Sequence, residues 1–174
     1  MTEQLSNEFL FSQIKIPYMK TVKEFMNKDV ISLSPDDTVF DAAKLLAQLK
    51  IAGAPVVKDE KIVGIISISD IVKFINIKLG KLPVMDSPGL GSLILILAQM
   101  QKLQLDFKKE LDKITCSKVG EVMTKNVIMI SPSSTLLEVA ELMERHDINR
   151  LPVVSEGKLI GIVTRADLVN ALIY

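Results

Sequence analysis

Two short stretches of the sequence combine a hydroxyl residue with an aspartate at the same spacing. Ser67 precedes Asp70 and Thr164 precedes Asp167 by three positions, and each pair follows an apolar run with strand character. An apolar stretch with helical spacing follows each aspartate, so both pairs are predicted to lie where a strand leads into a helix. The first N–H groups of a helix are unpaired and its dipole favours negative charge there. Such a corner can therefore hold a small anionic or ribose-bearing ligand.

A second interpretation needs no ligand. Serine, threonine and aspartate are also common helix caps, because their side-chain oxygens accept hydrogen bonds from the first helical N–H groups. For one copy of the pattern taken alone, a capped helix is the simpler interpretation.

The composition excludes several classes of function. The 174 residues are 48% hydrophobic and 24% charged, and 21 basic residues balance 21 acidic ones, so nothing draws the chain as a whole to nucleic acid or to an anionic membrane. The single cysteine, Cys116, and the single histidine, His146, provide neither a disulfide nor a metal-site spacing. The longest apolar run, Leu93–Ala98, is far shorter than the roughly 20 residues that span a bilayer. With no secretory signal at its start, the chain is expected to be cytoplasmic.

An internal repeat organises the chain. Residues 22–75 correspond to residues 119–172 without a gap: Pro35 matches Pro132, and Asp70 matches Asp167, each 97 positions later. The sequence therefore predicts four parts, namely an arm (1–20), a first repeat (21–78), a linker (79–116) and a second repeat (117–174).

Both repeats predict the same order of elements: a short apolar turn, a strand, a helix, two strands and a final helix. A capping box, in which a threonine and an acidic residue three places later satisfy each other's N–H groups, precedes the first helix of each repeat. It is formed by Thr38 with Asp41, and by Thr135 with Glu138. The predicted strands are Val30–Leu33, Ala54–Val57 and Ile62–Ser67, then Val127–Ile130, Leu151–Val154 and Leu159–Thr164, and the predicted final helices are Ile71–Lys78 and Leu168–Ile173.

The linker has no counterpart in the repeats. Helix-favouring residues run from Ser92 to Ile114, and the segment Leu93–Leu97 is apolar on every side. That end of the predicted helix must be covered, either within this chain or by a second copy of it.

Several motifs recur in order and at constant spacing, and together they resemble those of CBS domains. In the second repeat they are Val119-x-Glu121-Val122-Met123, Ser131-Pro132, the segment 148–154 and the segment 161–167, and the first repeat carries a weaker version. The pair resembles the tandem called a Bateman module. The resemblance covers about 110 of the 174 residues, and the arm and the linker fall outside it.

The resemblance implies an α+β fold in which two β-α-β-β-α repeats pack sheet to sheet with pseudo-twofold symmetry, with an added linker helix. Two clefts would then hold adenosine-type ligands. By position, Asp70 and Asp167 would bond ribose hydroxyls, while Ser67 and Thr164 would contact ribose or phosphate. Residues of the opposite repeat would complete each cleft: Asn149, Arg150 and Leu151 opposite Asp70, and Ala52, Gly53 and Ala54 opposite Asp167.

Side-chain chemistry adds detail to these roles. A carboxylate can accept hydrogen bonds from both hydroxyls of a ribose. The Arg150 guanidinium can hold a phosphate through two parallel N–H bonds, although a surface ion pair with Asp147 or a neighbouring glutamate is the alternative. Arg165 is the only motif cation expected near Asp167, so the two sites are expected to be unequal.

The predicted function is that of a regulatory module, not an enzyme, because no catalytic group or metal set accompanies the motifs. It would sense AMP, ADP, ATP, S-adenosylmethionine or a related adenosyl ligand without any catalytic cofactor, and would act through a protein partner or through its own homodimer. The alternative is a dimeric scaffold that binds a partner without a ligand, and nucleic-acid binding is the weakest hypothesis.

Overall fold

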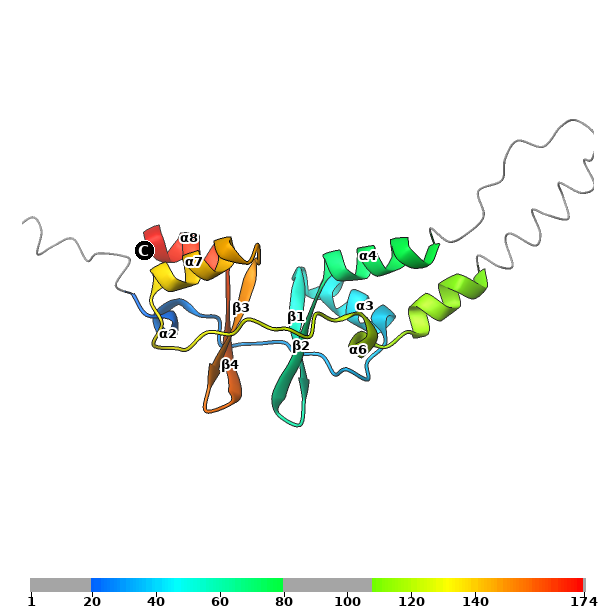
Figure 1. The fold of residues 1–174 in the computed structure, drawn as a ribbon, viewed down its shortest axis with the longest axis horizontal. Coiled ribbons are helices and arrows are strands. Elements are labelled where there is room, and N and C mark those ends of the chain that lie inside the picture. The colour runs from blue at the N-terminus through cyan, green and yellow to red at the C-terminus, as the bar shows by residue number, and fades with distance from the viewer. Residues whose placement is uncertain (1–19, 80–107, 174) are drawn as a thin grey trace, which may run out of the picture. The chain divides into compact units, whose positions relative to one another are not determined.

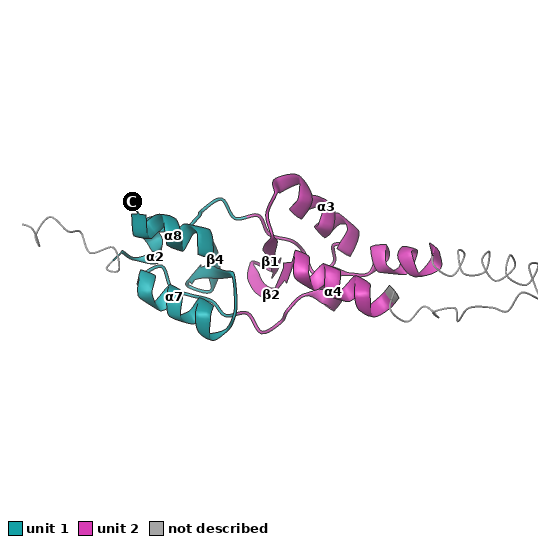
Figure 2. Cartoon of the chain, turned by 90° about the horizontal axis from the view of Figure 1, so that it is seen from above, with its two compact units in different colours: residues 1–30, 128–174 teal, residues 31–127 magenta. Residues whose placement is uncertain are grey.

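The computed structural model describes residues 20–79 and 108–173 (Figure 1). The chain is α+β and divides into two compact units, which Figure 2 distinguishes by colour: unit 1 comprises residues 1–30 and 128–174, and unit 2 comprises residues 31–127. The predicted arm, except for Lys20, and the apolar run of the linker lie outside the described residues. Residues 108–116 are helical, in agreement with the last part of the predicted linker helix.

Each unit contains one antiparallel hairpin. In unit 2, β1 (Gly53–Lys58) pairs with β2 (Lys61–Ser67), and in unit 1, β3 (Arg150–Ser155) pairs with β4 (Lys158–Thr164). The two central residues of both turns have positive φ, as tight two-residue hairpins require. The registers match, since Gly53 lies opposite Ser67 and Arg150 lies opposite Thr164. Both predicted hairpins are confirmed.

The helices that flank each hairpin are α3 (Val39–Leu49) and α4 (Ile68–Leu79) in unit 2, and α7 (Leu136–Arg145) and α8 (Arg165–Ile173) in unit 1. The Thr38 hydroxyl accepts a hydrogen bond from the Asp41 N–H at 3.0 Å. At α7 the Glu138 carboxylate also accepts from the Thr135 N–H at 3.0 Å, which confirms the predicted capping box. The final helices α4 and α8 each begin three residues earlier than predicted, because the hydroxyl residue precedes the first turn and the aspartate lies within it.

The predicted strands Val30–Leu33 and Val127–Ile130 are wrong. Each segment makes only one parallel bridge, Leu33 with Val56 and Ile130 with Val153. A longer parallel ladder would need N–H donors from prolines, which have none, on both sides of each bridge. The prolines concerned are Pro35 and Pro55 in unit 2, and Pro132 and Pro152 in unit 1.

The repeats exchange their opening helices. The first repeat's α2 (Val22–Phe25) lies in unit 1, where the Val22 N–H donates to the Ser134 carbonyl at 2.8 Å. The second repeat's α6 (Val119–Val122) lies in unit 2, where the Val119 N–H donates to the Asp37 carbonyl at 2.9 Å. Each compact unit is therefore assembled from both sequence repeats.

Each unit has its own apolar core, and the exchanged helix is part of it. Val22 and Val119 are both fully buried. The buried residues of unit 2 are Leu33, Val39, Ala42, Leu46, Ala54, Val56, Ile66, Ile71 and Val119, and those of unit 1 are Val22, Ile130, Val139, Met143, Leu151, Val153 and Val163.

A glycine in the second strand of each hairpin receives the methionine that follows the exchanged helix. A Cβ placed on Gly161 would lie 2.5 Å from the Met26 sulfur, and one on Gly64 would lie closer still to the Met123 sulfur. The strand leaves room for the methionine only because glycine has no side chain. We call these two contacts the Gly–Met notches.

Filling a notch should destabilise the fold. Gly161→Ala is expected to lower the free energy of unfolding by about 1–3 kcal/mol, because the extra methyl group overpacks the Met26 side chain. Chemical denaturation of the full chain measures this change. In a double-mutant cycle, adding Met26→Ala should recover part of the loss, and a Gly161→Ala protein as stable as the parent would contradict the proposed role of the notch.

Candidate ligand site

The first candidate corner, which we call the Ser67 corner, comprises residues 52–54 and 67–70 of unit 2. The Asp70 carboxylate accepts hydrogen bonds through Oδ2 from the Ser67 N–H at 2.8 Å and from the Ser67 hydroxyl at 2.6 Å. In return the Asp70 N–H donates to the Ser67 Oγ at 3.3 Å. The two residues thus form a reciprocal cap at the start of α4.

The second candidate, the Thr164 corner, comprises residues 149–151 and 164–167 of unit 1 and reproduces this geometry. Asp167 Oδ2 accepts from the Thr164 N–H at 2.8 Å and from the Thr164 hydroxyl at 2.7 Å, and the Asp167 N–H donates to Thr164 Oγ1 at 3.3 Å. The same three bonds thus occur in two separate units that share the spacing of hydroxyl and aspartate.

The cap uses only part of each carboxylate. All hydrogen bonds that Asp70 and Asp167 accept from described residues go to Oδ2, and both side chains are half-buried. Oδ1 therefore keeps the lone pairs that two ribose hydroxyls need. Capping and ligand binding do not compete, because they use different oxygens of the same group.

Each corner is joined by the residues that begin the first strand of its own hairpin. In unit 2 the Ile68 N–H donates to the Ala52 carbonyl at 3.0 Å, and Gly53 lies opposite Ser67. In unit 1 the Arg165 N–H donates to the Asn149 carbonyl at 3.1 Å, and Arg150 lies opposite Thr164.

In unit 2 the structure thus brings Ser67 and Asp70 together with Ala52, Gly53 and Ala54. In unit 1 it brings Thr164, Arg165 and Asp167 together with Asn149, Arg150 and Leu151. Ala54 and Leu151 are buried in the cores of their units. The expected completion of each cleft by the opposite repeat stays a prediction.

The two corners differ in charge. Arg165 donates to the Ile148 carbonyl at 3.3 Å and pairs with Asp147 at 3.4 Å. At the positions that match Arg150 and Arg165, the Ser67 corner has Gly53 and Ile68. Asp147, the alternative partner suggested above for Arg150, thus pairs with Arg165.

Sequence reasoning missed two residues that position the corners. Asn27 pairs with Ile162 and Thr124 pairs with Ile65, in each case two residues before the corner's hydroxyl. Asn27 and Thr124 correspond in the repeat, but their unlike side chains carry no common motif. The only signal in the sequence was the constant offset of 97 positions, which relates Asn27 to Thr124.

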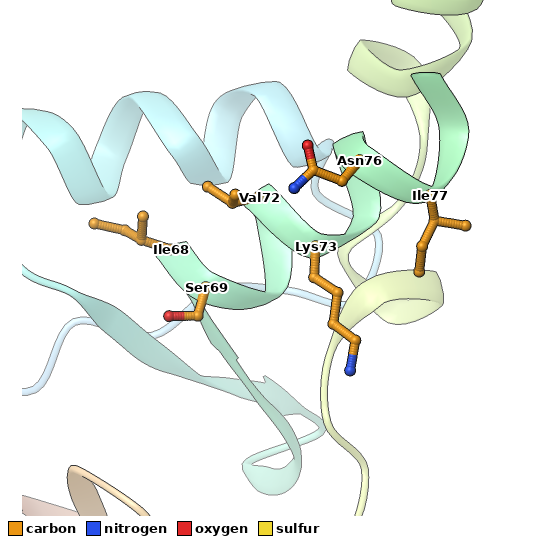
Figure 3. Close-up of a pocket in the computed structure, with 6 residues that line it drawn as sticks. All are labelled: Ile68, Ser69, Val72, Lys73, Asn76 and Ile77. Atoms are coloured by element: carbon orange, nitrogen blue, oxygen red, sulfur yellow. The ribbon is translucent and has the colours of Figure 1, made fainter. Parts of the chain in front are cut away.

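A shallow pocket of about 540 Å³ adjoins the Ser67 corner and is lined by side chains of α4 (Figure 3). Side chains of one helix face line it, and they mix apolar and polar groups: Ile68, Ser69, Val72, Lys73, Asn76 and Ile77. Ile68, Val72 and Ile77 are about half exposed, at 46%, 48% and 54%. An apolar surface of this kind is typical of a contact with another protein surface.

Neither a metal centre nor a membrane span occurs within the described ranges. No three His, Cys, Asp or Glu side chains among these residues are grouped as a metal ion would require. Within the same residues, no helix combines the length and apolar character needed to cross a bilayer.

The duplicated corner, the paired hairpins and the two repeats define a CBS-domain pair. The family model described as "CBS domain" matches residues 22–77 and again residues 119–174. The chain belongs to the CBS domain family.

Relatives by sequence include a protein of similar length and part of a longer enzyme. The Methanocaldococcus jannaschii protein MJ1426 is 42% identical over 154 residues, which cover 87% of this chain and 90% of that protein. Inosine-5'-monophosphate dehydrogenase of Korarchaeum cryptofilum is 32% identical over 86% of this chain, but the match spans only 24% of the enzyme.

Two similar solved structures contain adenosyl ligands. The structure of CBSX2 in complex with AMP has a TM-score of 0.63 and 28% identity, covering 88% of this chain and 96% of that one. The CBS domain pair of protein MJ0100, in complex with 5'-methylthioadenosine and S-adenosyl-L-methionine, has a TM-score of 0.61 and 26% identity, covering 87% and 94%.

The cap at the Thr164 corner can be tested without a ligand. Thr164→Val removes the hydroxyl that bonds Asp167 and is expected to lower the free energy of unfolding by about 1 kcal/mol. Thr164→Ser keeps the hydroxyl and serves as the matched control. Equal losses in the two variants, measured by chemical denaturation, would show that the hydroxyl does not stabilise the corner.

Proposed function

We propose that this protein is a regulatory module that binds an adenosyl compound at the Ser67 and Thr164 corners. The main observation in support is the reciprocal cap, present twice, which leaves Oδ1 of Asp70 and Asp167 to accept ribose hydroxyls. The relatives solved with AMP and with 5'-methylthioadenosine and S-adenosyl-L-methionine support the ligand class. AMP, ADP, ATP and S-adenosylmethionine are the candidate ligands.

We propose binding without catalysis. In both corners the carboxylate and the hydroxyl satisfy each other as a cap, and the Thr164 corner adds the two cations Arg150 and Arg165. The dehydrogenase relative supports this view, since the matched region is a quarter of that enzyme.

The proposal includes an output through protein contacts. Ligand binding can shift a conformational equilibrium only by the difference in affinity between two states, and a partner must read that shift. We propose a homodimer as the first such partner, with contacts through the apolar faces of α4 and α8. A regulated protein partner and a cytoplasmic location stay predictions.

Ligand binding is expected to raise the melting temperature. A ligand present at 100 times its dissociation constant stabilises the native state by about 2.7 kcal/mol. Thermal-shift assays with AMP, ADP, ATP and S-adenosylmethionine should therefore show a rise with at least one compound.

The aspartate variants show whether the corners bind that ligand. Asp70→Asn and Asp167→Asn keep a side-chain oxygen for the cap but remove the charge, so each variant should lose part of the shift while its ligand-free melting temperature changes little. Flat traces with all four compounds at millimolar concentration would favour the ligand-independent scaffold.

The dimer has a separate test. Val72 and Val169 occupy matching positions on α4 and α8 and are 48% and 53% exposed, so Val72→Glu and Val169→Glu should weaken self-association without disturbing a core. Light scattering is expected to give about twice the chain mass of 19.3 kDa for the parent protein, and less for the double variant. Lys44→Glu, at an exposed position on α3 outside the proposed contact, is the control. A parent protein that scatters as a monomer would contradict the proposal.

A further inference from the structure

The chain passes between the two units at residues 30–31 and again at residues 127–128. Both passages lie in short segments that are hydrogen-bonded at each end. We call residues 27–33 the first crossing segment and residues 124–130 the second crossing segment.

The first crossing segment is attached to β4 of unit 1 and to β1 of unit 2. Asn27 and Ile162 exchange two backbone hydrogen bonds, each of 2.9 Å. At the other end, the Leu33 N–H donates to the Pro55 carbonyl at 2.9 Å, and the Val57 N–H donates to the Leu33 carbonyl at 2.8 Å.

The second crossing segment repeats this arrangement with the units reversed. Thr124 and Ile65 exchange two backbone bonds of 2.9 Å within unit 2. Within unit 1, the Ile130 N–H donates to the Pro152 carbonyl at 3.0 Å, and the Val154 N–H donates to the Ile130 carbonyl at 2.9 Å.

These attachments lie close to the corners. Ile162 is two residues before Thr164, and Ile65 is two residues before Ser67, on the same strands. Pro55 follows Gly53, the partner of Ser67, by two residues. Each crossing segment therefore ties the strand that carries one corner to the hairpin that carries the other.

The segments are short and fixed at their starts. Five residues separate the two attachments, so a fully extended segment spans at most about 20 Å. Local bonds tighten both segments, from the Val30 N–H to the Lys28 carbonyl and from the Val127 N–H to the Lys125 carbonyl, each at 3.0 Å. The Gly–Met notches hold the chain immediately before Asn27 and Thr124. Because each segment is this short, a displacement at one of its attachments is passed on to the other.

We propose that the two crossing segments couple the two corners, so that a ligand at one corner raises the affinity of the other. This inference rests on the proposed function. A ligand that further restrains the end of β4 also further restrains Asn27, the first crossing segment and its attachment to β1. The second ligand then has less conformational entropy to remove, which produces positive cooperativity.

Calorimetry with AMP on the full chain measures the coupling. Asp70→Asn leaves only the Thr164 corner competent, and Asp167→Asn leaves only the Ser67 corner. Two affinities are compared for each corner after statistical correction: that of the second AMP bound by the parent protein, and that of AMP in the variant in which only this corner is competent. The first is expected to be at least about five-fold tighter.

Lengthening both crossing segments should remove this coupling. Gly-Gly inserted after Asp29 and after Asn126 should bring the ratio of affinities close to one, while each single-corner affinity changes by less than about two-fold. The matched control is the same insertion after Glu156, in the exposed turn between β3 and β4, and it should keep the coupling.

Hydrogen exchange gives a second readout that needs no insertion. In Asp70→Asn, saturating AMP should slow exchange of the Leu33 and Val57 amides, although the corner of their own unit is disabled. The inference would be overturned by unchanged exchange there, by equal affinities in parent and single-corner proteins, or by coupling that survives the insertions, and each of these results would leave the proposed function standing. One AMP per chain would overturn the inference and restrict the proposed function to one corner. If AMP does not bind, the coupling fails, and the thermal-shift assays with the other compounds decide separately on the proposed function.

Discussion

The structure depends on the exchange of the opening helices between the repeats. Val22 closes the core of unit 1 and Val119 closes the core of unit 2, and both are fully buried. Burying one such side chain contributes on the order of 1.5–3 kcal/mol, so a repeat without its exchanged helix would lose a sizeable part of a marginal stability. The exchange also places Asn27 beside β4, which is then hydrogen-bonded on both edges. The position of Thr164 is therefore set by both repeats.

In each corner a single carboxylate caps the helix and is also held in a fixed position. A helix start needs an acceptor for its first N–H groups, and Asp167 Oδ2 together with the Thr164 hydroxyl satisfies that need. Because folding itself fixes the carboxylate, little side-chain freedom is left to lose when a ligand reaches Oδ1, and pre-organisation of this kind favours affinity. The simpler interpretation of the sequence, a helix cap, thus describes the geometry that makes the binding interpretation workable.

The parts of the fold that the sequence predicted are those with local signals. Thr38 with Asp41 and Thr135 with Glu138 identified two helix starts, and the alternation of polar turns with apolar runs identified both hairpins. The predicted strand Val30–Leu33 was wrong because an apolar pattern carries no information about backbone N–H donors. Pro35 and Pro55 have no N–H group, so the ladder cannot extend. The exchange of α2 and α6 was beyond reach for another reason: two repeats with the same pattern offer equivalent cores, and nothing in the pattern says which of them an opening helix will join.

The differences between the repeats are as informative as the identities. Three matched pairs have a role in the backbone structure. Gly64 and Gly161 form the notches, Pro55 and Pro152 limit the ladders, and Asp70 and Asp167 cap the helices. Arg150 and Arg165 instead correspond to Gly53 and Ile68, although the backbone is paired in the same way at both corners. Since the fold does not require this difference, its physical effect is on the charge around each aspartate. Under the proposed function, two corners with one backbone and different charges should differ in the ligand charge that they prefer, and the crossing segments would let the occupancy of each one influence the other.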